Sequence, residues 1–514
     1  MGGHTVAAAA SVAATHSGPY PAALMRSPAP ITRLWQRISP RRMLVALLVL
    51  QCALHARYVG LPPSGFHTWR QTQVLSIARN YHDESMNLFE PRVDSRGPWS
   101  GVTGLEFPLP YYLMALGYEA FGFHHATHRL VMLLFSFVAM LGAYALGRAL
   151  SGRPGWGLAA AAMLILDPLF GYYSFVATPD VPMLGFLLLG FAALYRWSQT
   201  RRTRLLVAGS AALSLAALLK VSSVALWPAA AILLARGGRG ERTRQLPRVL
   251  AAVACGLLPV LAWYLWARHL SAVNHNHDFM LESKLPYPMA IVPGVARKVL
   301  LQWLPEVYLS YPQFMLALVG VFTLRRRGVS PAAAPLVAAA LGLLAYAVAV
   351  LPMLDMHDYF MTPVVVPLLL LALLGLWRIR ELARTVHTAR WALVVLLIAT
   401  AVVGPWRALS RFERSRPDPD LLSMEARLPA LIPDPHALVI AASDASPSIY
   451  LYFMHRKGWS VQEGLSADSL RSMVAQGARY MVSDSRPLEA GSGVGPQLKP
   501  VGQVGRFRVF RLGD

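Results

Sequence analysis

The feature that most limits how this chain can fold is an apolar window that recurs eleven times between residues 43 and 406. The windows approach the length of about 20 residues that a helix needs to cross a bilayer. They cover residues 43–61, 127–147, 156–174, 181–197, 205–219, 222–235, 249–267, 307–323, 331–352, 360–377 and 391–406. The pattern predicts a polytopic α-helical membrane protein with about 11 transmembrane helices.

The composition supports the same fold class. Hydrophobic residues make up 55% of the 514 residues and charged residues only 14%, which excludes an ordinary soluble protein. The net charge of +22 does not indicate nucleic-acid binding, because the Lys and Arg residues lie in short clusters between apolar windows. Cys52 and Cys255 both lie inside apolar windows, so neither a disulfide nor a cysteine metal site is expected.

The basic clusters also predict the topology. They occupy alternate loops, at Arg148 and Arg153, Arg201 to Arg204, Arg236 to Arg248, Arg325 to Arg327, and Arg378 to Arg390. The positive-inside rule places these loops and the N-terminus on the cytoplasmic side of a plasma membrane. The opposite side receives the 62–126 loop, the 175–180 turn, Lys220, the 268–306 loop and the 353–359 turn. We expect these five external segments to meet at one site.

The same sequence patterns divide the chain into three predicted regions. Residues 1–42 form a cytoplasmic tail expected to be disordered, residues 43–406 form the membrane domain, and residues 407–514 form a linker and a small extracytoplasmic α/β domain. Strand-like runs at 437–441 and 479–482 flank a helical stretch at 466–476. The arginines that follow the last window conflict with an external C-terminal domain.

The first external loop carries the strongest candidates for chemistry. His67, Trp69 and Arg70 form either an interfacial anchor or a site that holds a phosphate. Glu106 precedes a predicted helix that begins at Pro108. Its carboxylate is either placed there by the helix dipole or acts as a general base or cation ligand.

Other external segments add four candidates. Asp180 is either an N-cap or a functional acid, and Lys220 either extends to the interface or binds an anionic phosphate. His357 and Tyr359 belong either to an ordinary polar turn or to the site. The run Asn274 to Asp278 resembles a metal cluster, but a polar loop that covers the site is the favoured interpretation.

In their order along the chain, these residues resemble the GT-C glycosyltransferases over residues 43–377. The closest resemblance is to family 39-like bacterial members similar to protein O-mannosyltransferases and to the aminoarabinose transferases of lipid A. Arg70, Asp180 and the Glu-x-Pro of residues 106–108 match, and Lys220 matches in part. His67 stands where the family usually has an Asp, which leaves the catalytic base open.

The resemblance implies an inverting glycosyltransferase in the cell envelope. It would move a sugar from a polyprenyl-phosphate donor to a lipid, glycan or protein acceptor. By this resemblance, the donor-phosphate ligands are Arg70, Lys220, His357 and Tyr359, and the catalytic residues are His67, Glu106 and Asp180. Either His67 or Glu106 would deprotonate the acceptor, and a divalent cation could be shared by Glu106 and Asp180.

Two other functions remain open at this stage. A transporter or lipid flippase would line a path with buried polar groups, but charged residues gather at the external ends of the windows, with Asp167 as the main exception. A non-catalytic sensor or scaffold would bind a glycan through residues 416–514.

Overall fold

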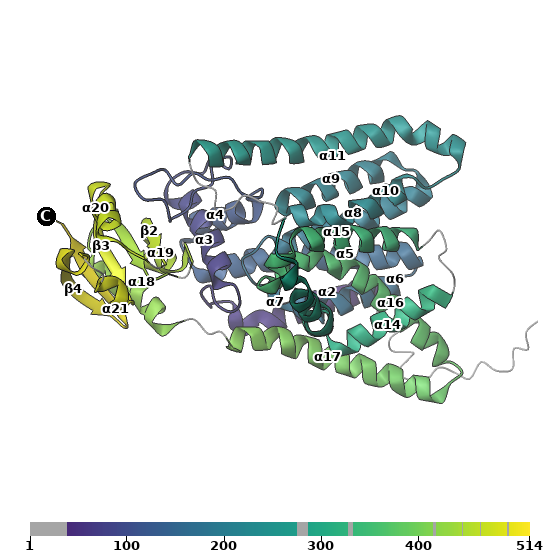
Figure 1. Ribbon diagram of the computed structural model, residues 1–514. Helices are drawn as coiled ribbons and strands as arrows, with labels where there is room; N and C mark the ends of the chain where they lie inside the picture. Colours follow the sequence, from purple (N-terminus) through teal and green to yellow (C-terminus); the bar gives the residue numbers. More distant parts are fainter. Residues whose placement is uncertain are drawn as a thin grey trace, which may run out of the picture.

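The computed structural model describes residues 39–274, 286–326, 333–414, 418–444, 446–462, 464–490 and 493–513. It consists of a helical bundle with a small C-terminal sheet at one end, next to α3 and α4 (Figure 1). Of the predicted tail, residues 1–38 lie outside the described residues, and the bundle begins with α2 at Pro40.

The helices of the bundle coincide with all eleven predicted windows. They are α2 (Pro40–His55), α5 (His125–Ser151), α6 (Pro154–Ile165), α7 (Pro168–Tyr173), α8 (Asp180–Thr200), α9 (Thr203–Leu219), α10 (Trp227–Leu234), α11 (Arg239–Val273), α14 (Tyr311–Arg326), α15 (Ala334–Ala349), α16 (Val365–Leu382) and α17 (His387–Arg414). Within the described residues, five helices are long and apolar enough to cross a membrane, or six if one bent pair counts as a span. Several candidate spans are therefore present, and the number eleven stays a prediction.

Shorter helices connect these elements. They are η2 (Ala56–Tyr58), α3 (Thr68–Asp83), α4 (Leu109–Phe121), η3 (Val221–Leu226), η4 (Met289–Ile291), α12 (Val292–Arg297), η5 (Lys298–Trp303), α13 (Leu304–Glu306), η6 (Leu351–Asp355) and η7 (Asp358–Val364). The segment 268–306 is more regular than a loop, because α11 continues to Val273 and helices occupy residues 289–306. Its residues 275–285, which contain most of the predicted His-rich run, lie outside the described residues.

Helices α5 and α8 pack closely because each carries a glycine at the contact. A Cβ atom on Gly142 would lie 2.8 Å from Cβ of Leu188, and one on Gly185 would lie 3.0 Å from the backbone nitrogen of Ala139. Small residues let helices in lipid approach until their backbones touch. This contact fixes the start of α8, where Asp180 lies.

The C-terminal domain combines a five-stranded sheet with helices. Its elements are α18 (Pro419–Leu431), β1 (Leu438–Ala442), α19 (Ile449–Met454), β2 (Gly458–Val461), α20 (Ala467–Ala475), β3 (Ala478–Ser483), α21 (Arg486–Glu489), η8 (Gly495–Gln497), β4 (Leu498–Val504) and β5 (Phe507–Leu512). The strand order is β2-β1-β3-β5-β4, with β1 parallel to β2 and β3, and β5 antiparallel to β3 and β4.

The predicted strands and helix of this domain match β1, β3 and α20. Ser466 caps α20, and its side chain accepts a hydrogen bond from the backbone of Ser469 at 3.1 Å. The linker predicted to begin at residue 407 begins later, because α17 continues to Arg414.

The sheet is attached to the first external loop through a buried acid. Asp94 accepts hydrogen bonds from Arg79 at 2.7 Å, Lys457 at 2.8 Å and Asn80 at 2.9 Å. Burial alone would raise the pKa of Asp94, but the charges of Lys457 and Arg79 hold it well below its usual range. The loop and the domain therefore share one charged core.

A second contact lies on α3 itself. The hydroxyl of Ser448 donates to the carbonyl of Trp69 at 2.9 Å and lies 3.0 Å from the hydroxyl of Thr72. Ser448 is buried at the start of α19. The C-terminal domain thus touches the first turns of α3 directly.

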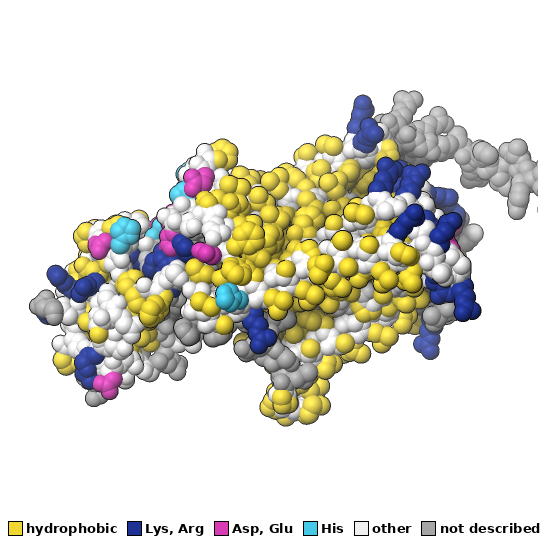
Figure 2. Space-filling view, turned by 90° about the horizontal axis from the view of Figure 1, so that it is seen from above, with side chains coloured by type: hydrophobic (Ala, Val, Ile, Leu, Met, Phe, Trp, Pro, Cys, Tyr) yellow, Lys and Arg dark blue, Asp and Glu magenta, His cyan; other side chains and the backbone are white. Residues whose placement is uncertain are grey.

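Apolar and basic side chains are unevenly distributed over the surface of the bundle. Figure 2 shows an apolar surface over the bundle and a cluster of Lys and Arg side chains at the end away from the C-terminal sheet. Such a distribution is typical of a helical membrane protein whose basic end faces the cytoplasm.

Candidate functional site

The predicted site residues gather at the end of the bundle that lies next to α3. They come from the starts of α3 and α8, the loop before α4, the break between α9 and η3, and the segment at η7. These residues are His67, Arg70, Glu106, Asp180, Lys220, His357 and Tyr359. The structure therefore brings together all seven residues that the sequence singled out.

Arg70 and Glu106 form the first buried ion pair of the site. The guanidinium of Arg70 binds the Glu106 carboxylate and also donates to Oε1 of Gln73 at 2.6 Å. The hydroxyl of Tyr111, in the first turn of α4, donates to the same oxygen of Glu106. Burial disfavours the charge of Arg70, but Glu106 outweighs that effect and the pKa of Arg70 is raised.

Asp180 and Lys220 form the second buried ion pair. Asp180 is the first residue of α8, and it binds Lys220 instead of capping the helix. Thr362 donates to Oδ1 of Asp180 at 3.3 Å, whereas Oδ2 is buried with no hydrogen-bond partner in the described part of the chain. The interpretation of Asp180 as an N-cap was wrong.

Lys220 lies in an extended break between α9 and η3, with φ of −160°. Its ammonium group lies 4.3 Å from the centre of the Tyr359 ring, and only 14% of its side chain is exposed. A cation held between a carboxylate and an aromatic face is directed into the protein. The alternative that Lys220 extends to the interface was therefore wrong.

His67 contacts a carboxylate from the far end of the chain. Its Nε2 lies 3.1 Å from Oδ1 of Asp358, and Asp358 also accepts from Tyr173 at 2.5 Å and from Arg411 at 2.6 Å. His67 precedes α3 with φ of 58°, a left-handed conformation that is uncommon for residues other than glycine. The side chain is thus fixed in position and orientation.

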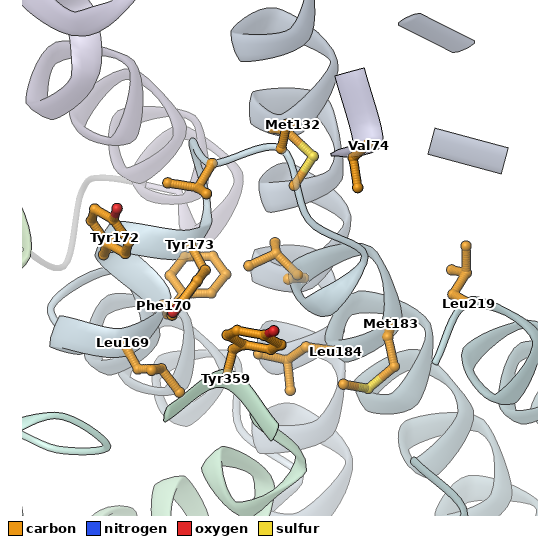
Figure 3. Close-up of a cluster of buried hydrophobic side chains, with 14 of the residues drawn as sticks. Val74, Met132, Leu169, Phe170, Tyr172, Tyr173, Met183, Leu184, Leu219 and Tyr359 are labelled. Carbon is orange, nitrogen blue, oxygen red and sulfur yellow. The ribbon is translucent and has the colours of Figure 1, made fainter. Parts of the chain in front are cut away.

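Asp358, Tyr173 and Arg411 belong to the same cluster, and sequence reasoning did not include them among the site residues. The guanidinium of Arg411 lies 4.2 Å from the centre of the Tyr172 ring, and Tyr173 belongs to the buried cluster shown with Tyr359 in Figure 3. Arg411 could have been found, because an arginine after the last window contradicted the external location of the C-terminal domain. Tyr173 gave no such signal.

His357 lies among aromatic rings, with its centre 5.5 Å from those of His67 and Trp69. Burial, with smaller effects of the neighbouring Lys220 ammonium and His67 ring, lowers the pKa of His357 to about 4. Its ring is therefore neutral near pH 7, so it can offer a phosphate hydrogen bonds but no positive charge.

The two carboxylates proposed to share a divalent cation each bind a cationic side chain instead. Glu106 binds Arg70 and Asp180 binds Lys220. Among the residues that the structure describes, no group of three or more His, Cys, Asp or Glu side chains is placed to hold a metal ion. A cation here would have to displace both basic residues.

Comparisons with known proteins agree with this geometry. Residues 106–266, which include Glu106, Asp180 and Lys220, match the model of the dolichyl-phosphate-mannose-protein mannosyltransferase family. No curated protein sequence matches the chain.

Two of the solved structures that are similar to the chain are those of ArnT from Cupriavidus metallidurans. The apo structure is 15% identical, with a TM-score of 0.61, and the alignment covers 92% of this chain and 98% of ArnT. The structure bound to undecaprenyl phosphate is 16% identical, with a TM-score of 0.59 and coverages of 91% and 97%. These findings confirm the predicted GT-C fold and do not favour the transporter.

Proposed function

We propose that this chain, a membrane protein with the fold of the GT-C glycosyltransferases, transfers a sugar from a polyprenyl phosphate to an acceptor outside the cytoplasm. The observation that carries the proposal is the convergence of two buried basic residues, Arg70 and Lys220, beside an oriented histidine, His67. Two cations can hold a phosphate, and a histidine can accept a proton from the nucleophile. The acceptor is a lipid, a glycan or a protein.

The lipid nature of the donor accounts for the place of the site. The site lies at the end of a bundle with an apolar surface, so a polyprenyl chain can remain in lipid while its phosphate reaches Arg70 and Lys220 (Figure 2). One of the ArnT structures similar to this chain is bound to undecaprenyl phosphate. We infer the same class of carrier for this chain.

Arg70 and Lys220 stabilise the leaving phosphate. The two side chains belong to one cluster of charges, since Glu106 and Asp180 each lie close enough to act on both of them. When the donor binds, its phosphate replaces some of the contacts that the two basic side chains make with Glu106 and Asp180. Tyr359 and neutral His357 donate further hydrogen bonds to the phosphate. Positive groups held in place before the reaction stabilise the charge that develops as the sugar–phosphate bond breaks.

His67 is the base that the contacts favour. With Nε2 donating to Asp358, Nδ1 keeps a lone pair and can accept a proton. Glu106 is a weaker candidate, because Oε1 of its carboxylate already accepts hydrogen bonds from both Arg70 and Tyr111. We assign to Glu106 and Asp180 the role of holding Arg70 and Lys220 in place.

The reaction follows from these assignments. The acceptor oxygen attacks the anomeric carbon from the face opposite the phosphate and loses its proton to Nδ1 of His67. The bond between the anomeric carbon and the phosphate oxygen breaks, and the electron pair leaves with the polyprenyl phosphate. The configuration at the anomeric carbon is inverted, and no nucleotide takes part.

The orientation in the membrane is part of the proposal. The basic end of the bundle faces the cytoplasm together with the N-terminus, and the C-terminal domain lies outside, in a chain with about 11 spans. Arg411, which opposed this orientation, is accounted for by its ion pair with Asp358. The proposed location is the bacterial inner membrane.

The test uses the full-length protein in lipid, a panel of radiolabelled polyprenyl-phosphate sugars and a membrane extract as the acceptor source. We expect transfer of label by the wild type and loss of transfer in Arg70→Gln and His67→Gln. His82→Gln is the matched control, because His82 lies at the other end of α3 and is partly exposed. Equal transfer by His67→Gln and wild type would refute the assigned base, and no transfer from any donor would refute the function.

A further inference from the structure

A second site lies at the end of the bundle away from the C-terminal sheet. A cavity of about 690 Å³ is lined by the end of α5, the start of α6, the C-terminal half of α8, α10, the start of α15 and most of α16. Cavities that bind small molecules usually have volumes of about 300–1,000 Å³. This cavity is therefore large enough for part of a lipid.

The cavity is separate from the proposed active site. Asp180 begins α8, whereas Tyr195 of the same helix lines the cavity. With a rise of about 1.5 Å per residue, the two positions are about 22 Å apart along the helix. A head group bound at the basic end of the cavity would therefore not contact the donor phosphate site, although the apolar walls continue along α16 to Val366, four residues after Thr362.

The walls of the cavity are mostly apolar. They include Leu150, Phe191, Leu226, Leu336, Leu370 and Trp377. Side chains that face an unfilled apolar space lack partners for dispersion contacts, and an acyl chain would supply them. The walls therefore suit a hydrocarbon chain and not a polar metabolite.

The rim of the cavity is basic. Arg153, Arg236 and Arg384 line it together with one described carboxylate, Glu381, which pairs with Arg384 at 2.6 Å. Neither Arg153 nor Arg236 pairs with a carboxylate of the described part of the chain. Two guanidinium groups next to an apolar cavity form the chemical complement of a phosphodiester attached to acyl chains.

We propose that this cavity binds an anionic phospholipid from the cytoplasmic leaflet. An acyl chain lies between α8, α10 and α16, and the phosphate is bound by Arg153 and Arg236. Basic pockets between membrane helices on the cytoplasmic side bind anionic head groups in this way. Free phosphate would satisfy the arginines but would leave the apolar walls unfilled.

The test measures retention of two lipids with the same acyl chains by the full-length protein in detergent. Native mass spectrometry is used to count dioleoyl phosphatidylglycerol and dioleoyl phosphatidylcholine on each variant. We expect the wild type to retain more phosphatidylglycerol than phosphatidylcholine. Each of Arg153→Gln and Arg236→Gln should lower that preference about fivefold, because one basic residue near an anionic lipid surface contributes about 1 kcal/mol. The matched control is the pair Arg202→Gln and Arg204→Gln, which removes two exposed arginines that do not line the cavity.

The location is tested by fluorescence. Trp156 and Trp377 line the cavity, so phosphatidylglycerol with brominated acyl chains should quench both. If the double variant Trp156→Phe with Trp377→Phe shows the same quenching as the wild type, the lipid does not bind in this cavity. Equal retention of the two lipids by the wild type, an equal loss in the control pair, or displacement of the lipid by inorganic phosphate would also overturn the assignment. Because the readout is lipid retention, these outcomes do not depend on sugar transfer.

Discussion

Nε2 of His67 lies 3.1 Å from Oδ1 of Asp358, although 291 positions separate the two residues in the chain. The contact joins the first external loop to the segment that begins η7, and Arg411 extends it to the end of α17. Three distant parts of the sequence thus fix one imidazole. Most of what we expect of this protein depends on that arrangement.

Replacing Asp358 tests the orientation of the base. In Asp358→Asn the carboxylate that holds His67 becomes an amide, which no longer favours the tautomer with a lone pair on Nδ1. We expect kcat for sugar transfer to fall about 100-fold or more, because a positioned general base contributes at least that factor to the rate. KM for the donor should change little. Steady-state kinetics give both constants. Asp355→Asn is the control, since Asp355 lies nearby on an exposed turn and pairs with Lys298; an equal loss there would contradict the assignment.

Replacing one or both members of the Asp180–Lys220 pair separates folding from function. Lys220→Gln leaves the buried carboxyl group of Asp180 without its cation, which should cost about 3–5 kcal/mol of stability. The double variant Asp180→Asn with Lys220→Gln removes both charges, so it should regain most of the thermal stability but none of the transfer activity. Melting temperature and transfer are measured on the same preparations. Recovery of activity in the double variant would show that Lys220 has only a structural role.

Protonation of His357 should destabilise the protein in acid. Its pKa is lowered from 6.5 to about 4, so the unfolded chain binds a proton that the folded chain does not bind between these values. Its contribution to stability is therefore complete above about pH 6.5 and is lost as the pH falls toward 4. Melting curves across this range should fall less steeply for His357→Gln than for wild type. His436→Gln, at an exposed position of the C-terminal domain, should reproduce the wild-type slope.

The buried acid between the first loop and the sheet should hold the C-terminal domain in place. Asp94→Asn removes the buried carboxylate between Arg79 and Lys457 and leaves them only the longer contacts with Asp83 at 3.9 Å and Glu84 at 3.6 Å, so we expect a loss of about 3–5 kcal/mol. Hydrogen exchange should increase first in β2 and α19, which adjoin this contact. Asp468→Asn is the control, because Asp468 is exposed on α20. Unchanged exchange in Asp94→Asn would show that other contacts hold the domain.

The sequence predicted the bundle well because apolar windows and basic loops are local properties. It also identified seven residues that the structure brings together, since a charged residue at the end of an apolar window is conspicuous in a chain with only 14% charged residues. The extent of the helices was harder to predict. The arginines after residue 406 suggested a linker, but α17 continues to Arg414, and Arg411 pairs with Asp358 within it.

The pairing of the site residues could not be predicted from the sequence. Tyr111 and Tyr173 lie in apolar surroundings, and only the packed structure shows that their hydroxyls bind Glu106 and Asp358. The charge state of His357 is a second example, because it follows from burial and from neighbours far away in the chain. Such effects arise from tertiary contacts, which a single sequence does not record.

The contact of Ser448 with Trp69 and Thr72 has a consequence for how acceptor choice can evolve. Arg70 lies between these two residues, so the C-terminal domain contacts the helical turn that carries the proposed ligand of the donor phosphate. A change in the sheet that shifts α19 would alter the tilt of that turn, and with it the space left for the incoming acceptor. New acceptors can therefore be accommodated by substitutions outside the membrane bundle, while the residues that handle the donor stay the same.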